Sequence, residues 1–328
     1  MSPLFRQINR LLAILLVVLI LPLILAGCMM TQPVFEGGKR SAATVDPDAL
    51  RRNVETICSN YTPRSCVDTR NLARCADWIG AAFSNAGGRV TNQLYVADGR
   101  EYRNVIGRFG PEQGPVVVAG AHYDACSGMP AADDNASGVA GLVELAAMFG
   151  RQAPGCTLEL VAYCTEEPPF FATPDMGSVH HARLLKSSGA EVRGVIVLET
   201  IGFFSDEAGS QQYPSVLLRL FYPSTGDYIG IVGNMGHTWL VRQVKRAMRA
   251  ATDLPVRSIN APSFVPGVDF SDHRSYWDAG FQAVMVTDTA FYRNRAYHTW
   301  GDTPDRLDYR RMAKVVVGVY EAIRSLAQ

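Results

Sequence analysis

The sequence lacks an excess of charge of either sign. It has 328 residues, of which 31 are Lys or Arg and 31 are Asp or Glu, so the formal net charge is zero. It contains no run of basic residues, and we therefore expect no binding to nucleic acid through the phosphate backbone. It also lacks the G-x-S-x-G sequence of the α/β-hydrolases, which argues against a serine hydrolase.

Long hydrophobic runs are absent too, except at the N-terminus. Arg6 and Arg10 precede the apolar run LLAILLVVLILPLILAGC, which ends at Cys28. A basic start, an apolar segment and small residues before a break are typical of a secretory signal. The residues LAGC resemble a bacterial lipobox, so we expect residues 1–27 to be a lipoprotein signal peptide and Cys28 to carry the lipid.

This N-terminal pattern predicts a location and a domain boundary. Position 29 is Met rather than Asp, which in similar lipoproteins favours the outer membrane. We therefore expect an exported, membrane-anchored lipoprotein of the bacterial cell envelope, in the outer membrane and facing the periplasm. Residues 28–45 would be a tether and residues 46–328 a single domain. The alternative is an uncleaved membrane anchor, for which the 17 residues from Leu11 to Gly27 are at the short limit.

The cysteines show no C-x-x-C spacing of the kind that ligates a metal. Export would place the six cysteines that follow Cys28 in an oxidising compartment, where disulfides form. Six cysteines allow many pairings, and their spacing does not choose among them. We expect a disulfide between Cys58 and Cys66, which flank the short segment SNYTPRS.

Two kinds of apolar pattern alternate along the chain. Helical spacing of apolar residues occurs in five segments, 67–86, 137–150, 178–188, 236–252 and 306–326. Continuous apolar runs predict buried strands in four segments, 115–122, 156–165, 194–199 and 281–288, and residues 89–97 and 102–109 have the pattern of a hairpin. Strands that alternate with helices predict an α/β fold, here a three-layer α/β/α sandwich with a mixed, mostly parallel central sheet.

Polar side chains follow the four buried strands at the point where each ends. They are His122 with Asp124, the pair Glu166–Glu167, Glu199, and Asp288 with His298 in the loop beyond it. Since ligands bind at the carboxyl ends of strands in open α/β sheets, we expect these residues to meet at one edge. Residues 203–235 show no clear periodicity, and a loop of that length is usually functional, so we expect it to form a wall of the site.

Two adjacent aspartates, Asp133 and Asp134, stand where an apolar strand gives way to a helix. Taken alone, DDNASG is the pattern of a helix N-terminus, and TEEP at residues 165–168 is that of a solvated loop. Neither interpretation explains why so many acids converge on one sheet edge, where buried like charges repel. Metal ions remove this conflict, and carboxylate and imidazole ligands suit zinc. One Asp of the pair would bridge two ions about 3.5–4 Å apart.

These residues closely resemble the di-zinc aminopeptidases of metallopeptidase family twenty-eight, which includes bacterial leucyl aminopeptidases and related glutaminyl cyclases. The similarity covers roughly residues 100–310 and follows six blocks in order, GAHYD, ADDNASG, TEE, LETIG, SDHRSYWDAGFQAV and YHTWGDT. The segment GDYIGIVGN at residues 226–234 is also similar to bacterial members. The resemblance implies the zinc exopeptidase fold and two zinc ions per chain.

The resemblance also assigns roles to individual residues. His122 and Glu199 would bind one zinc, Glu167 and His298 the other, and Asp134 would bridge both. Glu166 would be the general base, and Asp124 would orient His122. Asp272 and His273, in the SDH block, would lie near the substrate pocket. The sequence departs from many members at Glu199, where Asp is common.

The function implied by this resemblance is an exopeptidase of peptides, which removes the N-terminal residue by attack of a metal-activated water. Three alternatives remain open. A glutaminyl cyclase would have the same fold but one zinc and no hydrolysis. A carboxypeptidase of the same architecture would act on peptides with a blocked N-terminus. A non-catalytic binding module would keep the fold but usually loses ligands or the base, and every position is filled here.

Overall fold

The computed structural model describes residues 3–34 and 40–328. Its central element is one sheet of eight strands in the order β1-β2-β4-β3-β5-β8-β6-β7. In chain order the strands are β1 Arg89–Ala97, β2 Arg100–Phe109, β3 Val116–His122, β4 Thr157–Tyr163, β5 Val192–Leu198, β6 Ile229–Gly233, β7 Val256–Asn260 and β8 Ala283–Thr287. Strands β4, β3, β5 and β8 pair in parallel, as β6 does with β7, whereas β1–β2, β2–β4 and β8–β6 are antiparallel. The predicted mixed, mostly parallel sheet is confirmed.

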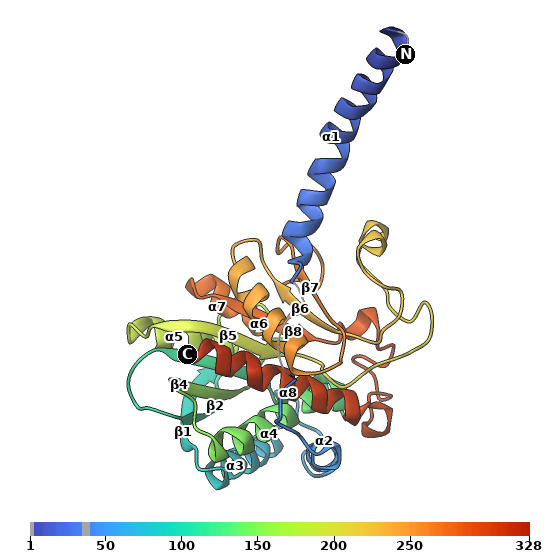
Figure 1. Cartoon of the computed structure of the whole chain (residues 1–328). Coiled ribbons are helices and arrows are strands. Elements are labelled where there is room, and N and C mark those ends of the chain that lie inside the picture. Colours follow the sequence, from blue (N-terminus) through green and yellow to red (C-terminus); the bar gives the residue numbers. More distant parts are fainter. Residues whose placement is uncertain (1–2, 35–39) are drawn as a thin grey trace.

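Helices cover both faces of this sheet (Figure 1). The helices of the body are α2 Pro47–Asn60, α3 Thr69–Asn85, α4 Gly138–Arg151, α5 Gly177–Ser187, α6 Thr238–Ala251, α7 His273–Ala279 and α8 Tyr309–Leu326. Helices α2, α3, α4, α6 and α8 form one layer, and the shorter α5 and α7 pack together on the other face. Buried residues of β3 alternate between the two cores, with Val117 and Ala119 in the larger core and Val116 and Val118 in the smaller one. The predicted three-layer α/β/α sandwich is therefore confirmed.

Four elements of the body are missing from the sequence prediction. No helix is predicted from the sequence in the segment of α2. Helix α7 is too short for its apolar residues to show a helical period. Strands β6 and β7 have only five residues each. Strand β6 lies inside the segment expected to be aperiodic, where two glycines of IGIVG interrupt the apolar pattern. Gly233 has no room for a side chain, because a Cβ there would stand 2.5 Å from Val241 Cγ2.

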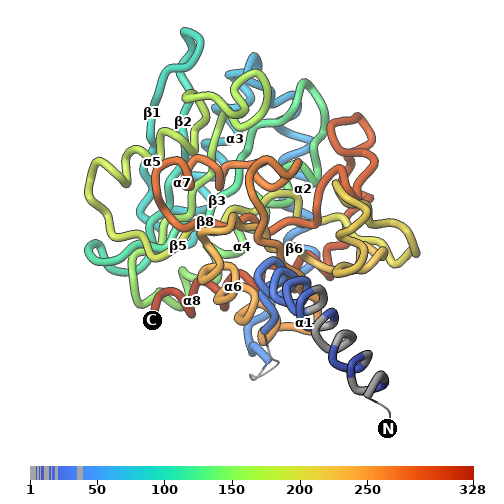
Figure 2. The backbone as a smooth tube through the Cα atoms, turned by 90° about the horizontal axis from the view of Figure 1, so that it is seen from above, coloured from blue at the N-terminus to red at the C-terminus, as the bar shows by residue number. Residues whose placement is uncertain are grey.

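Helix α1, Pro3–Thr31, extends away from the body in both views (Figures 1 and 2). Its C-terminal end lies against α6 and β7, where the Thr31 carbonyl accepts hydrogen bonds from Lys245 Nζ at 2.6 Å and Ser258 Oγ at 2.7 Å. Within the described ranges, no helix is both long and apolar enough to span a membrane. Residues 1–2 of the expected signal peptide and 35–39 of the expected tether lie outside the described residues.

Candidate active site

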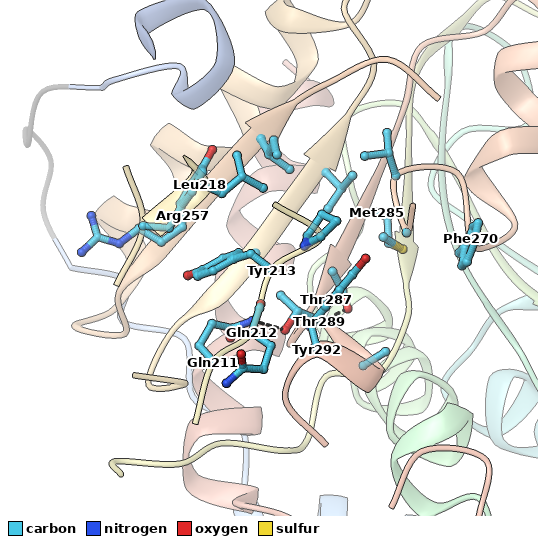
Figure 3. Close-up of a pocket in the computed structure, with 18 of the residues that line it drawn as sticks. Gln211, Gln212, Tyr213, Leu218, Arg257, Phe270, Met285, Thr287, Thr289 and Tyr292 are labelled. Atoms are coloured by element: carbon cyan, nitrogen blue, oxygen red, sulfur yellow. Dashed lines mark hydrogen bonds between the residues drawn. The ribbon is translucent and has the colours of Figure 1, made fainter. Parts of the chain in front are cut away.

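A pocket lies beside β6, β7 and β8 (Figure 3). It is partly open to solvent and holds a cavity of about 100 Å³, and its lining is largely apolar and aromatic. The lining includes Tyr213, Leu218, Tyr222, Tyr228, Val232, Val268, Phe270, Met285, Phe291 and Tyr297. Residues 211–228 supply many of these side chains, so part of the segment 203–235 forms a wall of this pocket. Glu199 belongs both to this lining and to a cluster of acidic and imidazole side chains.

That cluster begins at the end of β3. His122 is the last residue of this strand and is fully buried. Its Nδ1 atom lies 3.1 Å from the carbonyl oxygen of Asp124 and 3.5 Å from the Asp124 carboxylate. Because a carbonyl oxygen only accepts hydrogen bonds, the neutral ring carries its proton on Nδ1 and leaves the Nε2 lone pair free. Asp124 thus orients His122, through both its backbone and its side chain.

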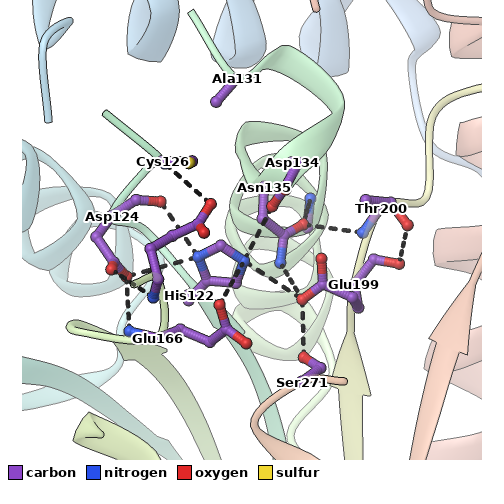
Figure 4. Close-up of polar contacts among 12 residues, drawn as sticks. His122, Asp124, Cys126, Ala131, Asp134, Asn135, Glu166, Glu199, Thr200 and Ser271 are labelled. Carbon is purple, nitrogen blue, oxygen red and sulfur yellow. Dashed lines mark hydrogen bonds and ion pairs between the residues drawn. The ribbon is translucent and has the colours of Figure 1, made fainter. Parts of the chain in front are cut away.

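Asp124 also positions the two glutamates that follow β4. Its Oδ1 atom accepts a hydrogen bond from the backbone N–H of Glu166 at 3.2 Å, and Oδ2 accepts one from Glu167 at 3.0 Å (Figure 4). The side chains of the pair then diverge. Glu167 reaches toward His298, with 3.2 Å between Oε2 and Nε2. Glu166 lies nearer His122, with 3.9 Å between Oε2 and Nε2.

The adjacent aspartates have different surroundings. The carboxylate of Asp133 accepts hydrogen bonds from the Gly202 backbone and from Asn294 Nδ2, both at 3.0 Å. Asp134 has extended, non-helical backbone angles within Ala132–Ser137, and its side chain points into the cluster. Helix α4 begins directly afterwards at Gly138, where a Cβ would stand 2.8 Å from the Leu198 carbonyl oxygen. The small residues of ASG therefore let this turn pack against the end of β5.

The two oxygens of Asp134 face different histidines. Oδ1 lies 3.2 Å from His122 Nε2, and Oδ2 lies 2.9 Å from His298 Nε2. Glu199 Oε2 completes the first group at 3.3 Å from His122 Nε2, and Ser271 Oγ donates a hydrogen bond to that oxygen at 2.7 Å. The structure therefore brings together all five residues expected to bind metal, in two groups that share one carboxylate.

The donor atoms in this cluster fit metal ions better than they fit one another. Asp134 Oδ2 and His298 Nε2 are buried and close together, yet neither makes a hydrogen bond. Buried polar atoms normally have partners, so two such atoms that lie close together are suited to bind a cation. Imidazole nitrogens and carboxylate oxygens are common zinc ligands. His122, Asp134 and Glu199 offer three ligand atoms within 4.8 Å of one another.

The protonation of these groups reflects the crowding of like charge. Burial raises the pKa of Glu166 well above its ordinary value. His122 lowers this pKa, whereas the negative charges of Glu199 and Glu167 raise it. Burial likewise raises the pKa of Glu167 to about 7, with the negative charge of Asp134 the next contribution. His298 has a pKa raised to about 11, because the neighbouring negative carboxylates of Asp134 and Glu167 favour its charged form and outweigh the lowering by burial.

Three sequence-predicted residues have other surroundings than expected. His273 does not line the pocket; it is fully buried, its Nε2 donates to the Val268 carbonyl at 2.8 Å, and burial lowers its pKa to about 4. Asp272 is also outside the pocket lining; it is buried beside the cluster, and neither of its carboxylate oxygens has a hydrogen-bond partner. Asp288 accepts hydrogen bonds from the backbone of Phe203 and Ala290, so it holds loops in place.

The expected disulfide between Cys58 and Cys66 is not formed. Both thiols are free, as are the other cysteines. Cys58 points into the core from α2, whereas Cys66 is half-buried in the turn before α3. The loop between them is instead fixed by Arg64, whose fully buried guanidinium donates hydrogen bonds to the carbonyls of Tyr123, Pro130 and Ala131 at 3.1, 2.7 and 2.6 Å.

Sequence reasoning missed Arg64, Ser271 and Tyr297 as contributors to the site. Tyr297 stacks on His298, with ring centroids 4.0 Å apart, and closes the pocket beside the cluster. Ser271 and Tyr297 lie inside the matched blocks SDH and YHT, so their positions next to Asp272 and His298 were the available signal. Arg64 is far from every motif in sequence, and only the fold shows what it contacts.

Residues 104–323 match the sequence model of Peptidase family M28. The chain is 43% identical over 314 residues to the uncharacterized protein YfbL of Escherichia coli, an alignment that covers 93% of this chain and 95% of YfbL. It is 26% identical over 335 residues to a probable zinc metalloprotease of Pyricularia oryzae, covering 86% of this chain and 64% of that protein. It is 27% identical over 225 residues to a probable leucine aminopeptidase of Arthroderma otae, covering 63% and 53%. The chain therefore spans less than two thirds of these two fungal relatives.

Solved structures share the fold. The LapA aminopeptidase of Legionella pneumophila superposes with a TM-score of 0.68 at 18% identity, covering 86% of this chain and 72% of that one. A glutaminyl cyclase of Bacteroides thetaiotaomicron gives 0.66 at 18% identity, covering 87% and 99%. At this level of identity the likeness establishes the architecture, which hydrolytic and cyclising enzymes have in common.

Proposed function

The chain belongs to Peptidase family M28, and from that premise we propose that it is a zinc-dependent aminopeptidase with two metal ions. His122, Asp134 and Glu199 would hold one ion, and Asp134, Glu167 and His298 the other. The observation that carries this proposal is the position of Asp134, whose two oxygens lie 3.2 Å and 2.9 Å from the Nε2 atoms of two different histidines. A single-ion site has no need of a carboxylate with both oxygens directed at separate ligand groups.

The zinc ions, when bound, lower the pKa of a water molecule and stabilise negative charge on the scissile carbonyl oxygen. Glu166 is the residue placed to move the proton. Among the described residues no hydrogen bond holds its carboxylate, and its Oε2 atom lies 3.9 Å from His122 Nε2 at the inner edge of the cluster. A raised pKa suits a group that takes a proton from water and passes it to the leaving amine. Asp124 accepts a hydrogen bond from the backbone N–H of Glu166 and so holds the base at a fixed position beside the metal ligands.

The pocket beside Glu199 supports a preference for peptides with a large apolar N-terminal residue. Its walls are formed by aromatic and aliphatic side chains, among them Phe270, Met285 and Tyr297. Burying such a side chain is favourable, at about 1.5–3 kcal/mol for Leu or Phe. The free α-amino group would then lie near the carboxylates of the cluster, because Glu199 belongs to both.

A panel of peptides tests this proposal. We expect the protein to release the first residue from peptides that begin with Leu or Phe, to act weakly on those that begin with Gly, and to leave their N-acetylated forms intact. A chelator should abolish the reaction, and Glu166→Gln serves as the inactive control. Cyclisation of N-terminal Gln without hydrolysis would identify a cyclase, cleavage of blocked peptides would identify a carboxypeptidase, and no reaction in any arm would support a binding module.

The proposal includes anchorage in the cell envelope. The LAGC sequence that ends at Cys28 supports lipid attachment, and export would bring the enzyme to peptides outside the cytoplasm. The residues just after Cys28 lie against α6 and β7, so the body would sit close to the membrane surface. Turnover or scavenging of peptides in the envelope is the role that this location favours.

A further inference from the structure

We propose that Cys126 is an additional ligand of the metal held by Glu167 and His298, so that the two metal positions differ in chemistry. This inference rests on the proposed function for the presence of the metal pair. It adds a sulfur ligand where the matched motifs supply only nitrogen and oxygen. Cys126 follows the GAHYD block by two residues, and its spacing to other cysteines gives no hint of metal binding.

The geometry places the thiol among the ligands. Ligand atoms of Cys126, Glu167 and His298 all lie within 4.8 Å of one another. The backbone N–H of Cys126 donates a hydrogen bond to Glu167 Oε1 at 2.9 Å (Figure 4). That contact leaves Glu167 Oε2 to face His298 Nε2 at 3.2 Å. Asp134 Oδ2 lies 2.9 Å from the same nitrogen, so a carboxylate oxygen of Asp134 adjoins this group of three donor atoms.

A second observation points to a ligand in this space. Asp134 Oδ2 and His298 Nε2 are buried without a hydrogen-bond partner, and Asp134 is only 3% exposed. Cys126, Asp134 and His298 line the same narrow cavity beside these atoms. Two unpaired atoms and a thiol that line the same cavity are what a cation site requires.

The loop that carries Cys126 is held in place by the protein itself. Arg64 donates hydrogen bonds to carbonyls at both ends of the loop, at Tyr123 on one side and at Pro130 and Ala131 on the other. The Arg64 carbonyl also accepts the N–H of Ala125 at 3.1 Å. The thiol is therefore presented by a fixed loop, and binding a metal does not require the loop to be ordered first.

The extra ligand gives the two positions different tasks. With one imidazole, two carboxylates and a thiolate, the position that includes Cys126 would offer four protein ligands, the number found in closed zinc sites. The position at His122, Asp134 and Glu199 would offer three protein ligands, the number found in catalytic zinc sites, where water is the fourth ligand. Glu166 lies on that side, nearer His122 than His298. A thiolate also selects zinc over manganese or magnesium, whereas the all-nitrogen-and-oxygen position discriminates less.

Cobalt reports a sulfur ligand directly. Full-length, metal-free protein loaded with two equivalents of Co²⁺ should show a thiolate-to-cobalt charge-transfer band in the near ultraviolet. The band should be lost in Cys126→Ser and kept in Cys66→Ser, a matched control because Cys66 is also a free, half-buried thiol. Zinc affinity in Cys126→Ser should fall about tenfold or more for one equivalent only.

A second measurement needs no variant. Zinc should protect Cys126 of the wild type from alkylation by iodoacetamide, read by mass spectrometry of the peptide, while Cys66 reacts equally with and without zinc. Two bound cobalt ions with no band, a band that persists in Cys126→Ser, or no protection by zinc would overturn the assignment of Cys126 and leave the peptidase proposal standing. Failure to bind any metal would overturn both.

Discussion

Oδ2 of Asp134 lies 2.9 Å from Nε2 of His298, yet the two atoms form no hydrogen bond. In the metal-free protein this contact depends on a charged imidazole, and in the loaded enzyme a cation would take the place of its proton.

Asp134→Ala should lose both metal ions, because the carboxylate of Asp134 faces both groups. His298→Ala should lose mainly one, since His122 and Glu199 keep the other position intact. Elemental analysis of the two purified variants checks this difference. Two full equivalents of zinc in Asp134→Ala would show that Asp134 is not a bridge.

The adjacent glutamates should separate into a base and a ligand. Glu166→Gln should keep both metals and the fold and lose about 10²–10⁴-fold in kcat, with little change in KM. Glu167→Gln should lose metal instead, because Glu167 Oε2 faces His298. Zinc content and turnover are measured together for each variant. If Glu166→Gln loses zinc while Glu167→Gln retains it, the two roles are reversed.

Filling the pocket should change specificity without removing activity. Val268→Phe places a larger side chain in the apolar lining, where Val268 is buried. The kcat/KM for peptides that begin with Leu should fall about tenfold or more, since apolar pockets discriminate by about 1–3 kcal/mol per methylene. Peptides that begin with Ala should be affected less. An equal loss for both substrates would place the specificity pocket elsewhere.

The metal-free protein should become less stable as the pH rises from about 4 to about 7. Burial raises the pKa of Asp272 to about 7, so between its ordinary value and 7 the native state holds more protons than the unfolded chain. The free energy of unfolding therefore falls with rising pH in this window. Thermal unfolding of Asp272→Asn, without metal, should show a smaller decrease of the melting temperature over the same range. A wild-type protein whose decrease matches that of the variant would rule out this residue as the cause.

Membrane attachment should depend on Cys28. Cys28→Ser should be released from the membrane fraction or accumulate as an unprocessed precursor, because the thiol carries the lipid in the expected lipoprotein. Fractionation followed by mass spectrometry of the N-terminus distinguishes these results from the wild type. A variant that stays anchored and is processed like the wild type would exclude lipidation.

The sequence predicted the cluster because its ligands stand at strand ends. His122, Glu167 and Glu199 follow runs of buried residues, and parallel pairing of these strands forces their ends together. The same reasoning did not foresee the contacts of Asp288, since a polar residue at a strand end can equally bind backbone. Strand register shows where a residue lies, but not what its side chain contacts.

The short elements and the loop contacts could not be predicted in this way. Strands β6 and β7 are too brief for a period to appear, and neighbouring strands supply their pairing. The disulfide prediction used only the nearness of Cys58 and Cys66 in sequence, whereas Arg64 fixes the loop that follows β3. Cys126 lies beside Glu167 and His298 because of the path that this loop follows, and no local sequence pattern predicts that path.

The number of metal ions per chain tests the central claim most directly. Metal-free wild-type protein is titrated with zinc in a calorimeter, and release of leucine from a leucyl peptide is followed in the same samples. We expect two equivalents to bind and hydrolysis to depend on them. Saturation at one equivalent, or hydrolysis that persists in the metal-free protein, would contradict a bridged pair of zinc ions at Asp134.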